Sequence, residues 1–316
     1  MDVLLQCLSH TPLMQYISPG DAVRDRNTQA LAQLKTQLQD FDPELIFLFG
    51  PDHYNGFFYD LMPAFCVGVA GETVGDFDTE KGRLNIPADI ARACAGSLLE
   101  QGIDVAISHR MQVDHGFAQP LQLLAGAVGR HAVVPIFLNC VAEPMTTCWR
   151  ARLLGEAVGR YAATLQRRCA FIGSGGLSHN PPVPQLDDAP ADVAERLIAG
   201  RNPSAEARQA RQQRTIAAAR EFARGTTGLR PLNPAWDRQF LDTLAAWNVE
   251  RLDAMQNAAI TEHGGNSAHE IKTWIAANAA FRRATGGRAQ VSVHYYEPIP
   301  EWISGFGTMS GRGLRG

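Results

Sequence analysis

The 316-residue sequence predicts an α/β fold with a central sheet flanked by helices. Over the first two thirds, short apolar runs alternate with amphipathic stretches, which is the pattern of strands followed by helices. Beyond Asn180 the residues become helix-forming and rich in Ala and Arg, so we expect a mostly helical C-terminal third. No internal repeat or flexible linker divides the chain, and residues 1–316 are therefore expected to form one domain.

The individual elements follow from these patterns in chain order. Apolar runs predict strands at residues 3–7, 45–49, 65–69, 103–107, 133–138 and 170–172. Helical spacing predicts helices at residues 19–41, 90–99, 147–166, 206–224, 239–247 and 268–280. Prolines at positions 181, 182, 184 and 190 preclude regular structure there. Residues 294–306 form a tail rich in Pro and aromatic residues, which we expect to pack back over the core.

The charge balance excludes partners that need a strongly basic protein. With 29 basic and 32 acidic residues the net charge is −3, so no global positive field attracts nucleic acid or anionic membranes. The six cysteines form no C-x-x-C pair, and we expect buried free thiols. Neither a signal segment nor an apolar run of about 18 residues occurs. These features favour a cytoplasmic protein.

Four of the nine histidines come after predicted strands. His10 follows the first strand, His53 the second, and His179 the strand that ends near residue 172, while His115 lies in the loop beyond the strand at residues 103–107. In an open α/β sheet, ligands bind outside the carboxyl ends of the strands. We therefore expect these imidazoles to meet at one rim of the sheet.

His10 and His53 are candidate metal ligands at this rim. One loop histidine more often caps a turn or pairs with a neighbour, but two histidines with a carboxylate form the facial triad that holds Fe(II) with open positions for oxygen. Glu270, in the first turn of the helix at residues 268–280, is the candidate carboxylate. Spacing alone favours a simpler explanation, an N-terminal acid stabilised by the helix dipole. Asp52 and Asp114 are alternatives, and each could instead orient the histidine beside it.

Glycines flank the other two candidate histidines. Gly116 follows His115, and the segment 173–176 before His179 reads Gly-Ser-Gly-Gly. Glycine permits close approach of the backbone to a ligand, although a tight turn explains it as well. The segment lacks the Lys of a phosphate-binding loop and the first glycine of a G-x-S-x-G nucleophile turn. It therefore predicts neither a nucleotide-binding loop nor a serine nucleophile.

With these motifs the sequence resembles the class III extradiol ring-cleavage dioxygenases over almost its whole length. The resemblance implies that His10, His53 and Glu270 bind Fe(II), that His179 is a catalytic base and that His115 is an acid. It also implies a homo-oligomer of four subunits or more. The matching segments, in order, are residues 7–12, 51–60, 111–121, 173–184, 269–277 and 295–307.

The activity implied by the resemblance is meta cleavage of a 3-substituted catechol by dioxygen. The substrate would carry a short acidic side chain, propionate or cinnamate, and the product would be a 2-hydroxy-6-oxo dienedioate of aromatic degradation. Arg230 and Lys272 are possible partners for the carboxylate, although solvated surface charges explain them as well. Two other hypotheses stay open: a metal-dependent hydrolase that uses the same His/His/Glu site, and a non-catalytic binding protein with structural histidines.

Overall fold

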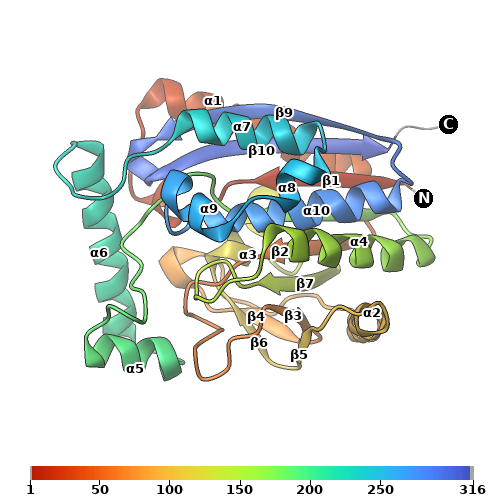
Figure 1. Ribbon diagram of the computed structural model, residues 1–316, viewed down its shortest axis with the longest axis horizontal. Helices are drawn as coiled ribbons and strands as arrows, with labels where there is room; N and C mark the ends of the chain where they lie inside the picture. The colour runs from red at the N-terminus through yellow and green to blue at the C-terminus, as the bar shows by residue number, and fades with distance from the viewer. Residues whose placement is uncertain (1, 314–316) are drawn as a thin grey trace.

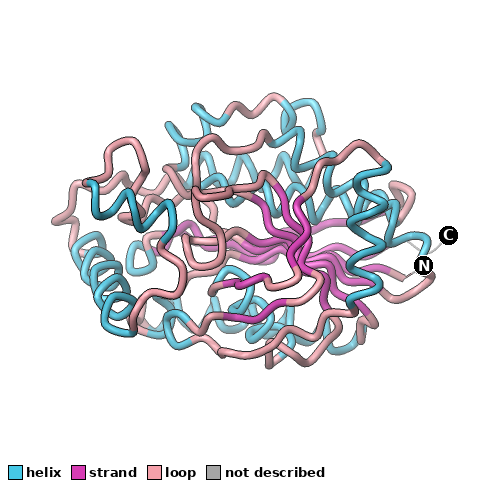
Figure 2. The backbone as a smooth tube through the Cα atoms, turned by 90° about the horizontal axis from the view of Figure 1, so that it is seen from below, coloured by secondary structure: helices cyan, strands magenta, loops and turns pink. Residues whose placement is uncertain are grey.

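The computed structural model describes residues 2–313 and contains a mixed sheet of eight strands between layers of helices (Figures 1 and 2). The strand order is β5-β3-β7-β2-β8-β1-β10-β9. Its strands are β1 (Val3–Leu8), β2 (Leu45–Gly50), β3 (Phe65–Gly68), β5 (Ala106–Ser108), β7 (Val133–Leu138), β8 (Cys169–Ser174), β9 (Ala289–Ile299) and β10 (Ser304–Gly313). A separate pair, β4 (Gly71–Thr73) and β6 (Met111–Val113), forms a small parallel sheet.

The centre of the large sheet consists of the parallel strands β7, β2, β8 and β1, and every residue of these four strands is buried. Strands buried on both faces are apolar throughout rather than alternating, which explains why these runs could be predicted from the sequence. On the other side of β1, the sheet continues antiparallel, because β10 pairs with β1 and β9 pairs with β10.

Helices cover both faces of the sheet. Phe47 of β2 belongs to an apolar core shared with α2 (Ala88–Glu100), α4 (Cys148–Thr164) and α10 (Ile271–Ala284). Its neighbours Ile46 and Leu48 point to the opposite face, where they share a second core with α1 (Asp21–Phe41) and α3 (His115–Ala125). Successive side chains of a strand alternate between the two faces, so each central strand contributes to both cores.

The remaining helices lie outside these two layers. They are α5 (Ala191–Ala199), α6 (Ala205–Ala223), α7 (Pro234–Ala245), α8 (Val249–Asp253) and α9 (Asn257–Gly264), with short 3-10 turns η1 (Pro12–Gln15), η2 (Asp76–Asp78), η3 (Ala268–Glu270) and η4 (Pro300–Trp302). Helices α5 and α6 stand at the left of Figure 1, at the end of the molecule away from the N-terminus. There, α6 packs through Ile216 and Ala219 into the core that contains Leu13 and Trp302.

The structure confirms the α/β class and the central sheet flanked by helices, and it corrects parts of the expected layout. The tail at residues 294–306 does not pack over the core but lies mostly in β9 and β10, inside the sheet. The C-terminal third is therefore helical only as far as α10. The strand expected at residues 103–107 is limited to Ala106–Ser108, and α7 begins at Pro234 because Asn233 caps it.

Two expectations from composition can be compared with the structure. All six cysteines are buried and unpaired, as expected. Within residues 2–313, no helix has both the length and the apolar character that crossing a membrane requires.

Candidate active site

The carboxyl ends of three adjacent parallel strands deliver histidines to one place, as the sequence predicts. The strands β2, β8 and β1 are neighbours in the sheet, and the segments that follow them contain His53, His179 and His10. The rings of His10 and His53 lie 5.5 Å apart at an interplanar angle of 87°. Parallel strands end at the same edge, so residues distant in sequence become neighbours at this rim.

Glu270 lies among these histidines, at the junction of η3 and α10, and its side chain is fully buried. Its Oε1 is 3.0 Å from Nε2 of His53 and 3.5 Å from Nε2 of His179, and its Oε2 is 3.6 Å from Nε2 of His10. The amide of Gly176 donates to Oε2 over 2.7 Å. The carboxylate is therefore aimed at the three imidazole Nε2 atoms and held there by the backbone.

The fourth histidine, His115, arrives from a different element. It is the first residue of α3, capped by Asp114, and α3 follows β6 of the small sheet rather than a strand of the large one. Its ring is 4.5 Å from that of His53 and 5.4 Å from that of His10. All four histidines expected at the rim are thus close to Glu270 or to its neighbours.

Hydrogen bonds fix which nitrogen of each ring faces the site. Ser174 donates its hydroxyl hydrogen to the carbonyl of Gly116 (2.6 Å), so its oxygen accepts from Nδ1 of His10 (2.9 Å). Nδ1 of His53 donates to Asp114 (3.1 Å), and Nδ1 of His115 donates to Asp76 (2.5 Å). In each ring Nδ1 therefore carries a hydrogen, and Nε2 is the nitrogen that faces the site.

His179 has the same tautomer for a different reason. Its Nδ1 lies 3.0 Å from the carbonyl oxygen of Leu177, which can only accept, so Nδ1 carries the hydrogen. The backbone amide of His179 donates to Gly264 (2.8 Å), which anchors the turn. Its side chain keeps 11% of its surface exposed, against 2% for His10. Nε2 of His179 therefore faces Oε1 of Glu270, at 3.5 Å.

Three of the four histidines place possible metal-ligand atoms close to one another. The ligand atoms of His10, His53 and His115 all lie within 4.8 Å of one another. However, the rings of His53 and His115 are stacked with an interplanar angle of only 18°. The rings of His10 and His53 are instead nearly perpendicular, at 87°. Glu270 lies 3.6 Å from Nε2 of His10 and 3.0 Å from Nε2 of His53.

Burial and the neighbouring charges shift the pKa values of the candidate metal ligands. Burial lowers the pKa of His10 to about 3 despite the nearby Glu270, so this ring is neutral. Burial also opposes ionisation of Glu270, but His10, His179 and His53 outweigh it and hold its pKa well below the usual range. For His53, Asp114 and Glu270 overcome burial and raise the pKa. An anionic carboxylate beside imidazole nitrogens is a set of groups that fits a divalent metal ion.

The chain also matches the model of a known protein family. The model described as the catalytic LigB subunit of aromatic ring-opening dioxygenase matches residues 4–307. The chain belongs to this family of ring-opening dioxygenases. The membership confirms the resemblance seen in the sequence, and it excludes a non-catalytic binding protein as the description of the chain.

Individual relatives of this dioxygenase are similar over their full length. A protein of Dechloromonas aromatica strain RCB, named 2,3-dihydroxyphenylpropionate/2,3-dihydroxicinnamic acid 1,2-dioxygenase 2, is 55% identical and covers 98% of each chain. A relative of Paraburkholderia xenovorans strain LB400, named 2,3-dihydroxyphenylpropionate/2,3-dihydroxicinnamic acid 1,2-dioxygenase, is 54% identical over 99% of this chain and 98% of its own. The crystal structure of uncharacterized protein JW3007 from Escherichia coli K12 matches with a TM-score of 0.53 at 13% identity, covering 97% of this chain and 98% of that one. That last likeness shows the fold alone.

The two alternative carboxylates of the dioxygenase already have other partners. Oδ2 of Asp114 accepts from the backbone amide and Nδ1 of His53 and from Asn55, and its Oδ1 accepts from Gly116. Asp52 accepts from the backbone amides of residues 55, 56 and 57. Asp114 therefore orients His53 rather than its chain neighbour His115, and Asp52 stabilises the loop that follows it without contacting a histidine ring, so neither residue orients the histidine beside it.

The glycines of segment 173–176 serve close packing rather than a turn. A Cβ on Gly175 would lie 2.6 Å from Cβ of Glu270, and one on Gly176 would lie 2.6 Å from the ring of His179. Neither glycine has a positive φ. Of the two explanations that the sequence leaves open, close approach of functional side chains to the backbone is the correct one.

Two residues that hold the histidines were not predicted, Asp76 and Ser174. Asp76 lies 39 positions before His115 in the short turn η2, and both its oxygens bond to that residue, one to the amide and one to Nδ1. Ser174 ends β8 and orients His10. Nothing in their spacing marks them, because both contacts are made through space. The Gly-Ser-Gly-Gly pattern around Ser174 was the nearest available signal.

The two cations considered for a substrate carboxylate lie elsewhere. Arg230 is exposed and donates to the carbonyls of Thr261 (2.7 Å) and Glu262, in agreement with a surface role. Lys272 is fully buried in α10, so the expectation of a solvated charge was wrong for it. Lys272 is buried because α10 is enclosed between the sheet and α4. Its ammonium donates to Nδ1 of His269 over 2.9 Å.

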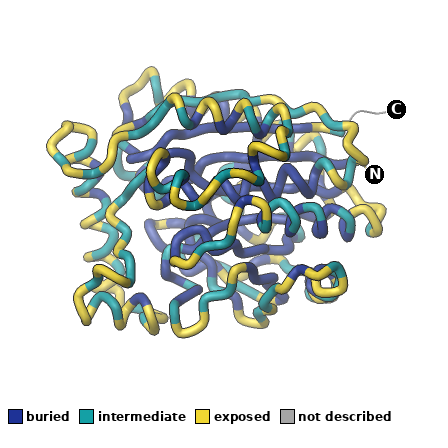
Figure 3. The backbone as a smooth tube through the Cα atoms, in the orientation of Figure 1, coloured by how far each residue is buried: buried dark blue, intermediate teal, exposed yellow. Residues whose placement is uncertain are grey.

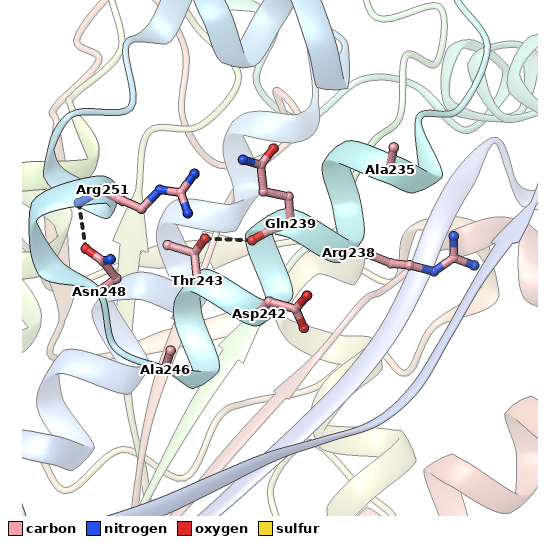
Figure 4. A pocket seen from close by; sticks show the side chains of 8 residues that line it. All are labelled: Ala235, Arg238, Gln239, Asp242, Thr243, Ala246, Asn248 and Arg251. Carbon is pink, nitrogen blue, oxygen red and sulfur yellow. Dashed lines mark hydrogen bonds between the residues drawn. The ribbon is translucent and has the colours of Figure 1, made fainter.

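A surface hollow on α7 and α8 is separate from this site (Figure 4). The hydroxyl of Thr243 donates to the carbonyl of Gln239, and the side chain of Asn248 accepts from the amide of Arg251, so these polar groups support the local helices. None of the histidines or carboxylates described above contributes to it. The hollow, of about 570 Å³, is lined by Ala235, Arg238, Gln239, Asp242, Thr243, Ala246, Asn248 and Arg251.

Proposed function

We propose that this dioxygenase uses Fe(II) to cleave a 3-substituted catechol on the extradiol side of the hydroxyl groups. The substrate would be 2,3-dihydroxyphenylpropionate or 2,3-dihydroxycinnamate, and the product the corresponding 2-hydroxy-6-oxo dienedioate. The names of relatives that are 54–55% identical over nearly the full length support this substrate class. The names of the relatives support the proposed substrate, and the geometry of the site supports the proposed residues.

The proposed metal ligands are His10, His53 and Glu270. The observation that supports them is the perpendicular arrangement of the His10 and His53 rings with Glu270 between their Nε2 atoms, whereas His115 is stacked on His53. Two imidazoles and one carboxylate leave coordination positions open. When bound, ferrous iron would supply chelation of both catechol oxygens and activation of dioxygen beside the ring.

His179 and His115 would move the protons. Nε2 of His179 lies 3.5 Å from Oε1 of Glu270 and can accept the first catechol proton. His115 is 94% buried at its side chain, and Asp76 fixes its Nδ1, so its Nε2 faces the site; once Nε2 has gained a proton, it can donate that proton to an oxygen of the reacting ring. The two roles would therefore fall on different elements, one in the segment after β8 and one at the start of α3.

Oxygen uptake is the experiment that tests the activity. The purified protein should be loaded anaerobically with Fe(II) or with Zn(II) and mixed with 2,3-dihydroxyphenylpropionate in air-saturated buffer. We expect stoichiometric oxygen uptake and a yellow ring-opened product with iron only. Activity should fade in peroxide and return with ascorbate and Fe(II). Full turnover of a hydrolysable substrate by the zinc form, with no oxygen uptake by the iron form, would instead establish the metal-dependent hydrolase.

Assembly and location belong to the same proposal. The resemblance supports a homo-oligomer of four subunits or more, and composition supports the cytoplasm. Size-exclusion chromatography with light scattering measures the mass of the oligomer directly. A monomeric mass at working concentration would contradict it.

A further inference from the structure

Two arginines of α6, Arg208 and Arg211, reach from this outer helix to the loops of the site. They are three positions apart and therefore lie on one face of the helix. Arg208 donates to the carbonyl of Val74 over 2.8 Å. Arg211 donates to the carbonyl of Tyr54 over 3.2 Å and to the side-chain oxygen of Asn55. Both arginines are half-buried.

Neither of these guanidinium groups is paired with an acid. Across residues 2–313, no Asp or Glu oxygen lies within 4.0 Å of Arg208 or Arg211, whereas half-buried Arg152 contacts both Asp253 and Glu156. A guanidinium has five N–H donors, and one or two bonds to neutral oxygens leave the others unused. Two unpaired positive charges on one face therefore leave room for an anion.

Their anchors place these charges beside the catalytic histidines. Tyr54 and Asn55 directly follow His53, and Asn55 donates to Asp114 (2.9 Å), which in turn holds His53. Val74 is two residues before Asp76, the partner of His115. The two anchor segments lie side by side, since both contact β6: the amide of Val74 donates to Val113, and a Cβ on Gly56 would overlap the carbonyl of Gln112.

We propose that Arg208 and Arg211 bind the carboxylate of the substrate's side chain and thereby select acidic catechols. The inference rests on the proposed function, because it needs the catechol ring at His10, His53 and Glu270. A ring held there presents its substituent to the neighbouring loops, and a chain of three carbons ends in a carboxylate. Arginine matches a carboxylate with two parallel hydrogen bonds, so the pair supplies both charge and direction.

The test compares substrates that differ only in charge. Wild type, Arg208→Gln and Arg211→Gln are assayed by oxygen uptake with 2,3-dihydroxyphenylpropionate and with the corresponding propanamide. Arg214→Gln is the matched control, because Arg214 is on the same helix but exposed. We expect the acid-to-amide ratio of kcat/KM to fall by about tenfold to a hundredfold in each of the first two variants. Arg214→Gln should leave the ratio unchanged.

Anaerobic titration of the iron-loaded proteins gives the dissociation constants for the same two compounds. The constant for the acid should rise in Arg208→Gln and Arg211→Gln, with partial recovery in Arg211→Lys. An equal loss on acid and amide would overturn the proposal and assign Arg211 to positioning Asn55. An unchanged ratio in both variants would also overturn it. If wild type consumes no oxygen with either compound, the proposed function fails instead, which is a distinguishable result.

Discussion

The candidate active site and the outer helices α5 and α6 are built in opposite ways. In Figure 3 the strands that lead to the centre are dark blue, whereas α5 and α6 are mainly exposed or intermediate. The side chains of Glu270 and His10 are 0% and 2% exposed. In contrast, the 19 residues of α6 include only two that are buried, Ile216 and Ala219.

With this difference, the buried centre would carry out the reaction and the exposed helix α6 would help to select the substrate. The centre is held by hydrogen bonds from strand ends and from the backbone, so its geometry depends on the whole sheet. Helix α6 is attached by a few apolar residues and by arginines that bind carbonyl oxygens. A change in α6 can therefore alter which catechol is accepted without rebuilding the chemistry.

The largest effect is expected from removal of Glu270, the proposed carboxylate ligand. Glu270→Ala should bind little iron and show no measurable turnover, because two neutral imidazoles alone hold Fe(II) weakly. Iron content by plasma emission and oxygen uptake measure this, and circular dichroism checks the fold. Glu262→Ala, on exposed α9, is the control. Full iron and wild-type turnover in Glu270→Ala would move the carboxylate role to Asp52 or Asp114.

Removing either proton-transfer group should be the next largest effect. His179→Ala and His115→Ala should keep iron but lose about a hundred- to ten-thousand-fold in rate. Anaerobic titration followed by mixing with oxygen separates the two steps. His179→Ala should bind catechol weakly at neutral pH and recover as pH rises, since free catechol then ionises without a base. His115→Ala should bind normally and slow down after oxygen is added. The reverse pattern would exchange the two assignments.

A smaller effect is expected from a residue that only holds a catalytic ring. Asp76→Asn should lower kcat by about tenfold to a hundredfold with iron content unchanged, because Nδ1 of His115 loses its charged acceptor. The neighbouring Asp78→Asn serves as control, because the side chain of Asp78 accepts from Tyr16 and not from a histidine. A wild-type kcat for Asp76→Asn would show that orientation of His115 does not depend on this carboxylate.

The smallest effect on the centre is expected from the outer layer. Ile216→Ala should weaken docking of α6 by about 2 kcal/mol, since it removes a buried side chain, and should increase cleavage by protease between α5 and α6. Iron content and turnover of 3-methylcatechol, which has no carboxylate, should stay close to wild type. Ile198→Ala, at a site already 37% exposed, is the control. Loss of iron in Ile216→Ala would contradict the expectation that the metal site does not depend on the docking of α6.

The fold was predictable where local pattern and burial agree. The apolar runs that became β1, β2, β7 and β8 are buried on both faces, and the histidines after three of them could therefore be placed at one rim. Strands β9 and β10 were not foreseen, because their pairing with β1 joins residues that are about 300 positions apart. Period-2 patterns that contain prolines and polar residues do not specify such partners.

For the site, the sequence pointed to the histidines and to a carboxylate, but not to the residues that hold them in place by hydrogen bonds. Spacing alone did not raise Glu270 above a helix-capping acid, because its position depends on how α10 packs against Gly175. The resemblance supplied that assignment. Asp76 and Ser174 could not be found at all, since each touches its histidine only after the chain has folded.

The position of β10 has a consequence for synthesis of the protein. Strand β1 carries His10 into the centre, and it is bonded on one side to β8 and on the other to β10, with Leu4 opposite Arg312. During translation, β1 is made long before its second neighbour β10. One edge of β1 is therefore unpaired until Ser304–Gly313 has emerged. Until then the nascent chain must keep that edge from pairing with other strands, and the sheet that supports the centre is completed only once β10 has been made.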